Sequence, residues 1–185
     1  MTTVDSPTAG GIAAALRRLY FVRFAFAIVW AVLLFTTKPH LGPLAVTLLV
    51  LYPLFDVAAA VVDARSSGAN GPARGLYVNI AISLLATVGL AIASASGVPA
   101  VLRVWGAWAI VAGLIQLIVA VSRRKMGGQV PMILSGGLSV LAGGSFFAGA
   151  SASNPALTNV GGYAVLGGIF FLVSAIRLGR ATKGN

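Results

Sequence analysis

The chain contains very few side chains that exchange protons near neutral pH. Among its 185 residues there are no cysteines, no glutamates, three aspartates and one histidine, and only 9% of the residues are charged. The absence of cysteine excludes a disulfide framework and a thiolate metal site. Because so few titratable groups remain for acid–base chemistry, we expect no enzymatic activity, no cofactor and no bound metal ion.

Apolar sequence takes up most of the chain, with 58% hydrophobic residues and a mean hydropathy of +0.97. A membrane-spanning helix needs about 20 mainly apolar residues, and in lipid its backbone groups must bond to one another. Six segments meet this requirement: 19–37, 42–62, 76–95, 101–122, 130–150 and 159–176. The sequence therefore predicts an all-α integral membrane protein, a six-helix bundle built as three antiparallel hairpins.

The ends of the chain differ in composition from this transmembrane domain, which we place at residues 16–178. Residues 1–15 are small and polar at first, which is typical of a flexible N-terminal tail. Residues 179–185 form a short basic C-terminal tail.

The distribution of basic residues predicts the orientation. Ten of the thirteen Lys and Arg residues fall on one side of the predicted spans: Arg17, Arg18, Arg65, Arg74, Arg123, Arg124, Lys125, Arg177, Arg180 and Lys183. Cytoplasmic loops carry such an excess, so we expect both termini to be cytoplasmic. The basic residues lack the aromatic interleaving of a nucleic-acid-binding face, so the net charge of +10 indicates the lipid bilayer, and no nucleic acid, as the partner.

An internal repeat is visible among the predicted helices. Residues 111–124 align with 166–180, and the register that places Gly113 opposite Gly168 also aligns neighbouring small residues; residues 52–65 fit this frame more loosely. The pattern predicts three copies of a two-helix unit of about 55–60 residues. All copies would share one orientation, unlike the inverted repeats of many transporters.

The stretch LRVWGAWAIVAGLIQLIVAVSRRKMGGQVPMILSGGLSVLAGGSFF (residues 102–147) combines regular glycine spacing, a Trp-rich helix and a basic, Gly-containing turn. In these features the chain resembles the HdeD-type bacterial membrane proteins, which are built on a short repeated two-helix domain of unknown function. The resemblance implies six helices in a bacterial inner (plasma) membrane and, from the family's namesake, a role in acid resistance. It supplies no catalytic residues. Pro53 and Asp56 depart from the family's pattern, which has Gly and an apolar residue at these positions.

Polar residues inside the predicted spans are candidates for function. They form a candidate intramembrane polar layer of Arg23, Asp56, Asn79, Gln116 and Ser135. We place Asp56 about 10 Å and Arg23 about 6 Å below the cytoplasmic surface, at 1.5 Å rise per residue. Three alternatives follow: a structural ion pair with interhelical hydrogen bonds, a proton or ion relay through Asp56, or an Arg23 side chain that extends to the lipid headgroups.

Small residues at helical spacing let helix backbones approach closely in membranes. The candidate helix-packing face comprises Ser135, Ser139, Gly143, Gly167 and Gly168. Such a face packs inside the bundle, forms the interface of a homo-oligomer, or lines a pore.

Other residues permit both an ordinary and a functional interpretation. His40 lies in a predicted outer turn and is either solvated or a sensor of pH. Trp30, Trp105 and Trp108 are interfacial anchors or packing residues, and residues 123–125 are expected in a solvated loop near the headgroups.

The sequence thus predicts a non-enzymatic, multi-pass inner-membrane protein of the HdeD type. We expect a role in stress or acid resistance, through helix packing or interaction with a partner. The alternative is a small transporter or channel with a polar path near Asp56. A third interpretation is an accessory subunit of a larger membrane complex.

Overall fold

The computed structural model describes residues 9–37, 41–67 and 73–181. These residues form six long α-helices and no strand: α1 (Ala9–Thr36), α2 (Pro43–Ser67), α3 (Ala73–Ser94), α4 (Val98–Ser122), α5 (Val130–Ala150) and α6 (Thr158–Ala181). A 3-10 helix, η1 (Arg124–Met126), joins α4 to α5. The predicted all-α six-helix bundle is confirmed.

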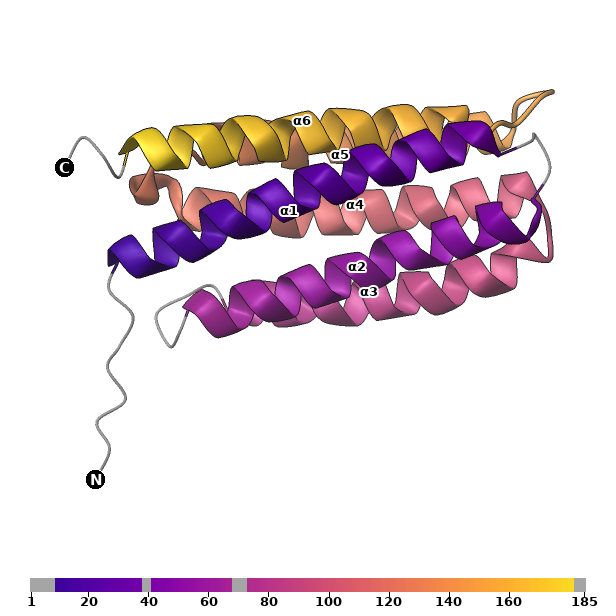
Figure 1. The fold of residues 1–185 in the computed structure, drawn as a ribbon. Helices are drawn as coiled ribbons and strands as arrows, with labels where there is room; N and C mark the ends of the chain where they lie inside the picture. The colour runs from indigo at the N-terminus through magenta and orange to yellow at the C-terminus, as the bar shows by residue number, and fades with distance from the viewer. Residues whose placement is uncertain (1–8, 38–40, 68–72, 182–185) are drawn as a thin grey trace.

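The helices run alternately up and down, so both ends of the described chain lie at the same end of the bundle (Figure 1). Each helix packs against its neighbours in the chain, and α6 also packs along α1, which closes the bundle into a ring. The most extensive contacts join α4 to α5, α1 to α6 and α2 to α3. The three predicted hairpins are therefore present as helices joined in the chain, but the most extensive packing is between helices of different hairpins.

Glycines explain the close approach of α4 and α5. A Cβ atom added at Gly113 would lie 2.8 Å from the carbonyl oxygen of Gly136, and one added at Gly143 would lie 2.6 Å from that of Gly106. These separations are shorter than van der Waals contact, so only glycine permits the two backbones to lie this close. Interhelical van der Waals contact is a main source of helix association in lipid.

Three helix boundaries differ from the prediction by five residues or more. Helix α1 begins at Ala9, so part of the segment 1–15 is helical, because Ala13 and Leu16 are buried in an apolar cluster with residues of α6. Helix α2 continues to Ser67, five residues beyond its predicted end at residue 62. Helix α6 continues to Ala181, so the segment predicted as a tail from residue 179 begins as helix.

Aromatic side chains fill the half of the bundle opposite the termini. The rings of Trp30 (α1) and Trp105 (α4) stack at 5.6 Å between centroids, and Trp108 packs edge-on against Trp105 at 5.3 Å. The indole nitrogen of Trp30 donates to the carbonyl oxygen of Leu48 at 2.6 Å. All three tryptophans are buried, so they are packing residues of the core and the interpretation as interfacial anchors is wrong.

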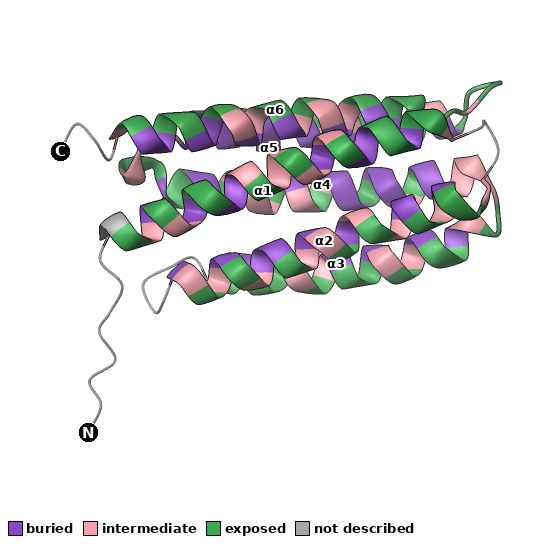
Figure 2. Cartoon of the chain, viewed as in Figure 1, coloured by how far each residue is buried: buried purple, intermediate pink, exposed green. Residues whose placement is uncertain are grey.

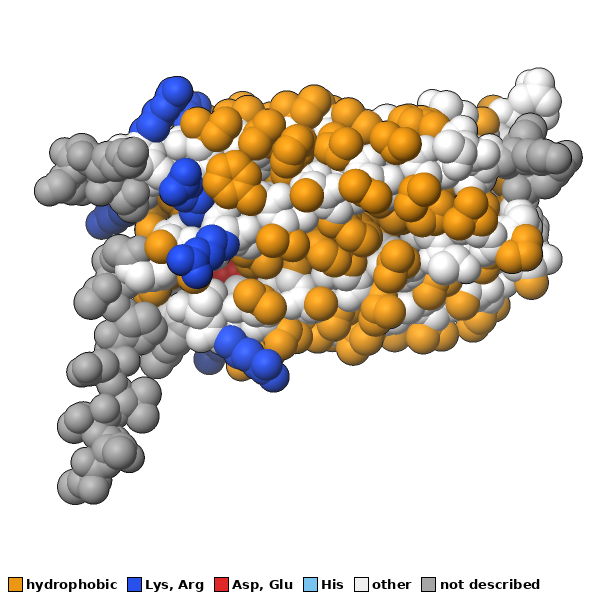
Figure 3. Space-filling view, in the orientation of Figure 1, with side chains coloured by type: hydrophobic (Ala, Val, Ile, Leu, Met, Phe, Trp, Pro, Cys, Tyr) orange, Lys and Arg blue, Asp and Glu red, His pale blue; other side chains and the backbone are white. Residues whose placement is uncertain are grey.

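The outer surface of the bundle is apolar along its length. In the most apolar stretch of each helix, at most 39% of the residues are buried inside the protein. The exposed residues follow the outward faces of the helices (Figure 2). Lys and Arg side chains gather at the end where both termini lie, and hydrophobic side chains cover the visible face between the two ends (Figure 3). A continuous apolar surface of this extent is typical of a membrane protein. The chain is therefore a multi-pass membrane protein.

Candidate functional site

Asp56 of α2 lies at the centre of a polar network inside the bundle. The guanidinium of Arg23 (α1) donates to its Oδ1 atom, and Asn79 and Ser83 of α3 donate to Oδ2 at 2.6 Å and 2.9 Å. Ser83 in turn accepts a hydrogen bond from the indole nitrogen of Trp108 (α4) at 3.0 Å. The network therefore joins four helices around one carboxylate.

A second ion pair lies about two helical turns closer to the termini than the first. Arg123, directly after α4, donates two hydrogen bonds to the carboxylate of Asp63 at 2.7 Å and 2.8 Å, and a third to Ser67 at 2.6 Å. The Ser67 hydroxyl also donates to Asp63 at 3.0 Å. Burial of Arg123 disfavours its charged form, but the hydrogen bonds and charge of Asp63 outweigh burial, so the pKa of Arg123 lies above its ordinary value.

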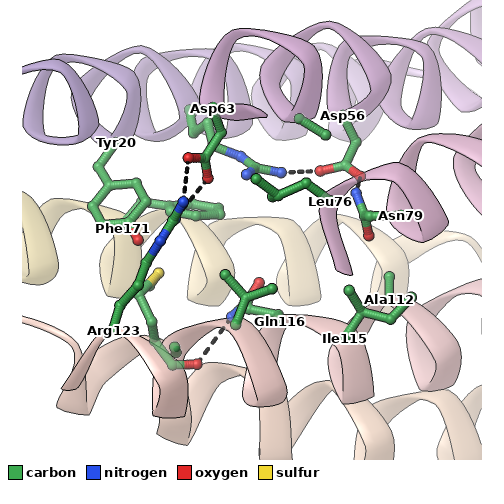
Figure 4. A pocket seen from close by; sticks show the side chains of 15 residues that line it. Tyr20, Asp56, Asp63, Leu76, Asn79, Ala112, Ile115, Gln116, Arg123 and Phe171 are labelled. Carbon is green, nitrogen blue, oxygen red and sulfur yellow. Dashed lines mark hydrogen bonds and ion pairs between the residues drawn. The ribbon is translucent and has the colours of Figure 1, made fainter. Parts of the chain in front are cut away.

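The two ion pairs face a common cavity of about 70 Å³ that is lined by residues of all six helices. Asn79 and Gln116 also line this cavity, and Figure 4 shows Asn79 turned toward Asp56 while Arg123 reaches across to Asp63. We call it the polar cavity. One water needs roughly 10–15 Å³ of such space, so the polar cavity has room for a few waters or a small polar group.

A second cavity of about 60 Å³ adjoins the first. Arg23, Asp56 and Gln116 line both cavities. The second cavity, which we call the central cavity, extends from them toward Ser135 of α5 and Tyr163 of α6. The exposed parts of Arg23 and Asp56, 17% and 11% of their side chains, are thus surfaces inside the protein that a small molecule can contact.

The polar layer lies farther from the helix ends than the sequence predicted. Asp56 lies eleven positions before Ser67, where α2 ends, which corresponds to about 16 Å at a rise of 1.5 Å per residue. The expected depth of about 10 Å was counted from a helix end at residue 62, whereas α2 continues to Ser67. Arg23 and Asp56 consequently lie near the middle of their helices.

Of the five residues predicted for the polar layer, the structure joins three by hydrogen bonds: Arg23, Asp56 and Asn79. Gln116 instead donates to the carbonyl oxygen of Met132 at 3.1 Å. Ser135 accepts a hydrogen bond on its backbone oxygen from Ser139 at 2.9 Å. Gln116 and Ser135 therefore belong to the walls of the cavities and have no bond to Asp56.

The environment of Arg23 decides between two of the alternatives. Its guanidinium faces Asp56 and lies 4.6 Å from the ring centroid of Phe171 (α6), a cation–π contact. The side chain therefore points into the bundle, and the alternative in which it extends to the lipid headgroups is wrong. Both oxygens of Asp56 are occupied by donors, an arrangement that disfavours a proton relay through this carboxylate.

Sequence reasoning missed the second ion pair. Residues 123–125 were expected in a solvated loop, yet the Arg123 side chain is only 6% exposed; for this residue the expectation was wrong. The available signal was the spacing of Asp56 and Asp63, because residues seven apart lie on one face of a helix. The chain has only three carboxylate side chains. Two of them on one face of an apolar helix indicate that each has a buried partner of opposite charge.

The candidate helix-packing face is only partly a packing face. Ser135, Ser139 and Gly143 are buried on α5 toward α4, and a Cβ atom added at Gly168 would lie 3.2 Å from Ala27 of α1. Gly167 differs, because a Cβ atom there would meet nothing within 4 Å. It lines the central cavity, so its assignment to the packing face was wrong.

The site contains no group of metal ligands. Among the described residues no three His, Cys, Asp or Glu side chains lie close enough to hold a metal ion. The predicted pH sensor His40 lies outside the described residues. What the site offers is hydrogen-bond donors and paired charges around two small cavities, which is suited to binding.

Comparison with known proteins leaves the site to be interpreted from its own geometry. The chain matches no protein-family model, no curated protein and no solved structure at a significant level.

Proposed function

We propose that this protein is a non-enzymatic membrane carrier that binds a small molecule at the polar cavity and the central cavity. One observation supports the proposal most directly: Asp56, Asn79 and Gln116, from three different helices, line one cavity inside the bundle. Residues that only stabilised the fold would need no shared cavity. Polar groups that converge on a cavity within a membrane are typical of a substrate path.

The donors of Arg23 are the groups best placed to hold a ligand. A guanidinium carries five N–H donors, and that of Arg23 contacts one carboxylate oxygen of Asp56 and the face of the Phe171 ring. Its other N–H groups are available to oxygen atoms of a molecule in either cavity. The ion pair with Asp56 holds the guanidinium in position, so Asp56 would orient Arg23 toward the ligand.

We place the protein in a bacterial inner membrane with both termini in the cytoplasm. The basic side chains at the end of the bundle that carries both termini support this orientation (Figure 3), because cytoplasmic loops are enriched in Lys and Arg. In this orientation the Asp63–Arg123 pair lies on the cytoplasmic side of the polar cavity. A solute from the cytoplasm would pass this pair before it reached Arg23.

A second candidate function is a packing or partner role of the HdeD type, related to stress or acid resistance. The pattern of residues 102–147 supports it. The two ion pairs found among the described residues also support it, because each buried charge already has a partner of opposite charge. In this alternative the polar network would only stabilise the bundle, which would act as a homo-oligomer or with another membrane protein.

Cysteine accessibility tests the carrier proposal. Since the chain has no cysteine, single-cysteine variants can be labelled without background. We expect Gln116→Cys to react with a membrane-impermeant thiol reagent in both right-side-out and inverted vesicles, because a carrier exposes its site to each side in turn. Leu141→Cys is the control, since Leu141 is 71% exposed on the outer surface of α5 and faces lipid.

Two outcomes would count against the carrier. If Gln116→Cys is folded but unreactive from both sides, the cavity is sealed and the packing role is favoured. If it reacts from one side only under all conditions, the cavity is a binding pocket and the protein is not a carrier. Size-exclusion chromatography of each variant establishes that it is folded.

A further inference from the structure

A third cavity opens between α5 and α6. It has a volume of about 320 Å³ and is mainly apolar, lined by leucines of both helices, Phe170 and small residues of α5. Leu138, Leu141 and Leu166 at this site are all exposed on the outer surface. We call it the lateral groove, because in a bilayer it would be open to the lipid chains.

The lateral groove adjoins the central cavity. Ser135, Ser139, Tyr163 and Gly167 line both the lateral groove and the central cavity. The Tyr163 hydroxyl donates to Ser139 at 3.0 Å across the gap between the helices. Gly167 has no side chain, and α5 and α6 have the least extensive contact of any neighbouring pair in the ring. From these two features we infer a passage beside this hydrogen bond.

The geometry points to a neutral single-chain amphiphile as the molecule that this protein carries, entering from the bilayer between α5 and α6. The inference rests on the proposed function and names its substrate class. The hydrocarbon chain would lie in the lateral groove. The head, with hydroxyl or carbonyl oxygens, would lie in the central cavity, where Arg23 donates hydrogen bonds to it.

The balance of charge around the cavities selects a neutral head. Arg23 is paired with Asp56, and Arg123 is paired with Asp63. A carboxylate or ammonium head would therefore add one unpaired charge to a site removed from water, which is unfavourable. A hydroxyl or carbonyl oxygen accepts a hydrogen bond from Arg23 and leaves the balance unchanged.

The sizes of the cavities select a small head and a single chain. The central cavity of about 60 Å³ has room for a few non-hydrogen atoms, whereas the lateral groove has about five times that volume and mostly apolar walls. A phosphodiester head with two chains would exceed the central cavity and would add a charge. A monoacylglycerol or a compound of similar shape fits both limits.

The test uses a monoacylglycerol with a photoreactive diazirine on its chain, added to the purified protein in lipid nanodiscs. We expect labelling of residues in α5 and α6 around the lateral groove. Gly167→Leu fills the passage without a clash at Cβ, since nothing lies within 4 Å, and should reduce labelling at least tenfold. Gly162→Leu is the matched control, because Gly162 is equally open and does not line the groove; its labelling should equal that of the unmodified protein.

Competition tests the choice of head. A fatty acid and a fatty amine of the same chain length should displace the probe at least tenfold less well than unlabelled monoacylglycerol. Equal displacement by either charged compound would overturn the inference, as would labelling of Gly167→Leu at the level of Gly162→Leu.

These failures differ from a failure of the proposed function. If the amphiphile does not bind but Gln116→Cys still reacts from both sides of the membrane, the protein carries a solute from water. If Gln116→Cys is also unreactive, the carrier proposal itself fails.

Discussion

The Asp63–Arg123 ion pair gives the sharpest quantitative test of the structure. The two side chains are only 7% and 6% exposed and are joined by two parallel hydrogen bonds. We consider the single variants Asp63→Leu and Arg123→Met and the double variant that contains both. Each single change leaves the remaining partner charged, buried and unpaired, whereas the double change replaces the pair by apolar side chains.

The expected magnitudes follow from burial. Removal of one partner of a buried pair lowers the free energy of unfolding by about 3–5 kcal/mol. Because this pair lies near one end of the bundle, we expect the lower end of that range, about 3 kcal/mol, for each single variant. The double variant should lose about 1 kcal/mol or less, since apolar replacement of both partners is often neutral. The coupling energy of the pair is then about 5 kcal/mol.

The assay is unfolding of the purified protein in mixed micelles by increasing SDS, followed by tryptophan fluorescence. The buried Trp30, Trp105 and Trp108 report loss of the core. Single variants that each lose less than about 0.5 kcal/mol would indicate a solvated surface pair. A double variant that loses the sum of the single losses would show that the two residues do not interact, and either result would refute the reasoning.

Three further predictions concern the network, the helix packing and the orientation. Asp56→Asn should lower the free energy of unfolding by about 1–3 kcal/mol, because it leaves buried donors poorly matched, and the double variant with Arg23→Gln should lose less; equal losses in the same SDS titration would contradict the pairing. Gly143→Ala should cost about 1–3 kcal/mol from overpacking, since its Cβ would lie 2.5 Å from a side chain and 2.6 Å from a carbonyl oxygen of α4. Gly144→Ala, with nothing within 4 Å, should be neutral or gain up to about 1 kcal/mol; thermal unfolding compares the two, and similar melting temperatures would count against the close contact. Lys125→Cys should react with an impermeant thiol reagent in inverted vesicles alone, and reaction in right-side-out vesicles would reverse the proposed orientation.

The number and type of the helices could be predicted from the sequence because of a strong physical constraint. In lipid a spanning segment must satisfy its own backbone hydrogen bonds, so each apolar run of about 20 residues had to be a helix. The ends were less certain. Asp63 and Ser67 extend α2 beyond its apolar run because Arg123 satisfies their polar groups, and a partner sixty residues away is invisible to a local pattern.

Some residues of the candidate site could likewise be identified from the sequence, and others could not. Arg23 and Asp56 were identified because a charge inside an apolar run is costly and needs a reason, and their expected proximity followed from the short connection between α1 and α2. Ser83 and Trp108 were missed as members of the network, since neither residue is unusual in a membrane helix. Gly167 was assigned to packing because the sequence shows that a residue is small but not what lies beside it.

The sequence by itself therefore determined the class of this protein, its six spans and the rarity of its buried charges, because each follows from the cost of moving polar groups into lipid. The tertiary structure alone decided which faces of the helices turn inward, which helices approach most closely and that a groove between α5 and α6 adjoins the central cavity. Those features depend on contacts between residues far apart in the chain. Apolar residues occupy every side of these helices, and their pattern cannot distinguish a face that packs on protein from a face that meets lipid.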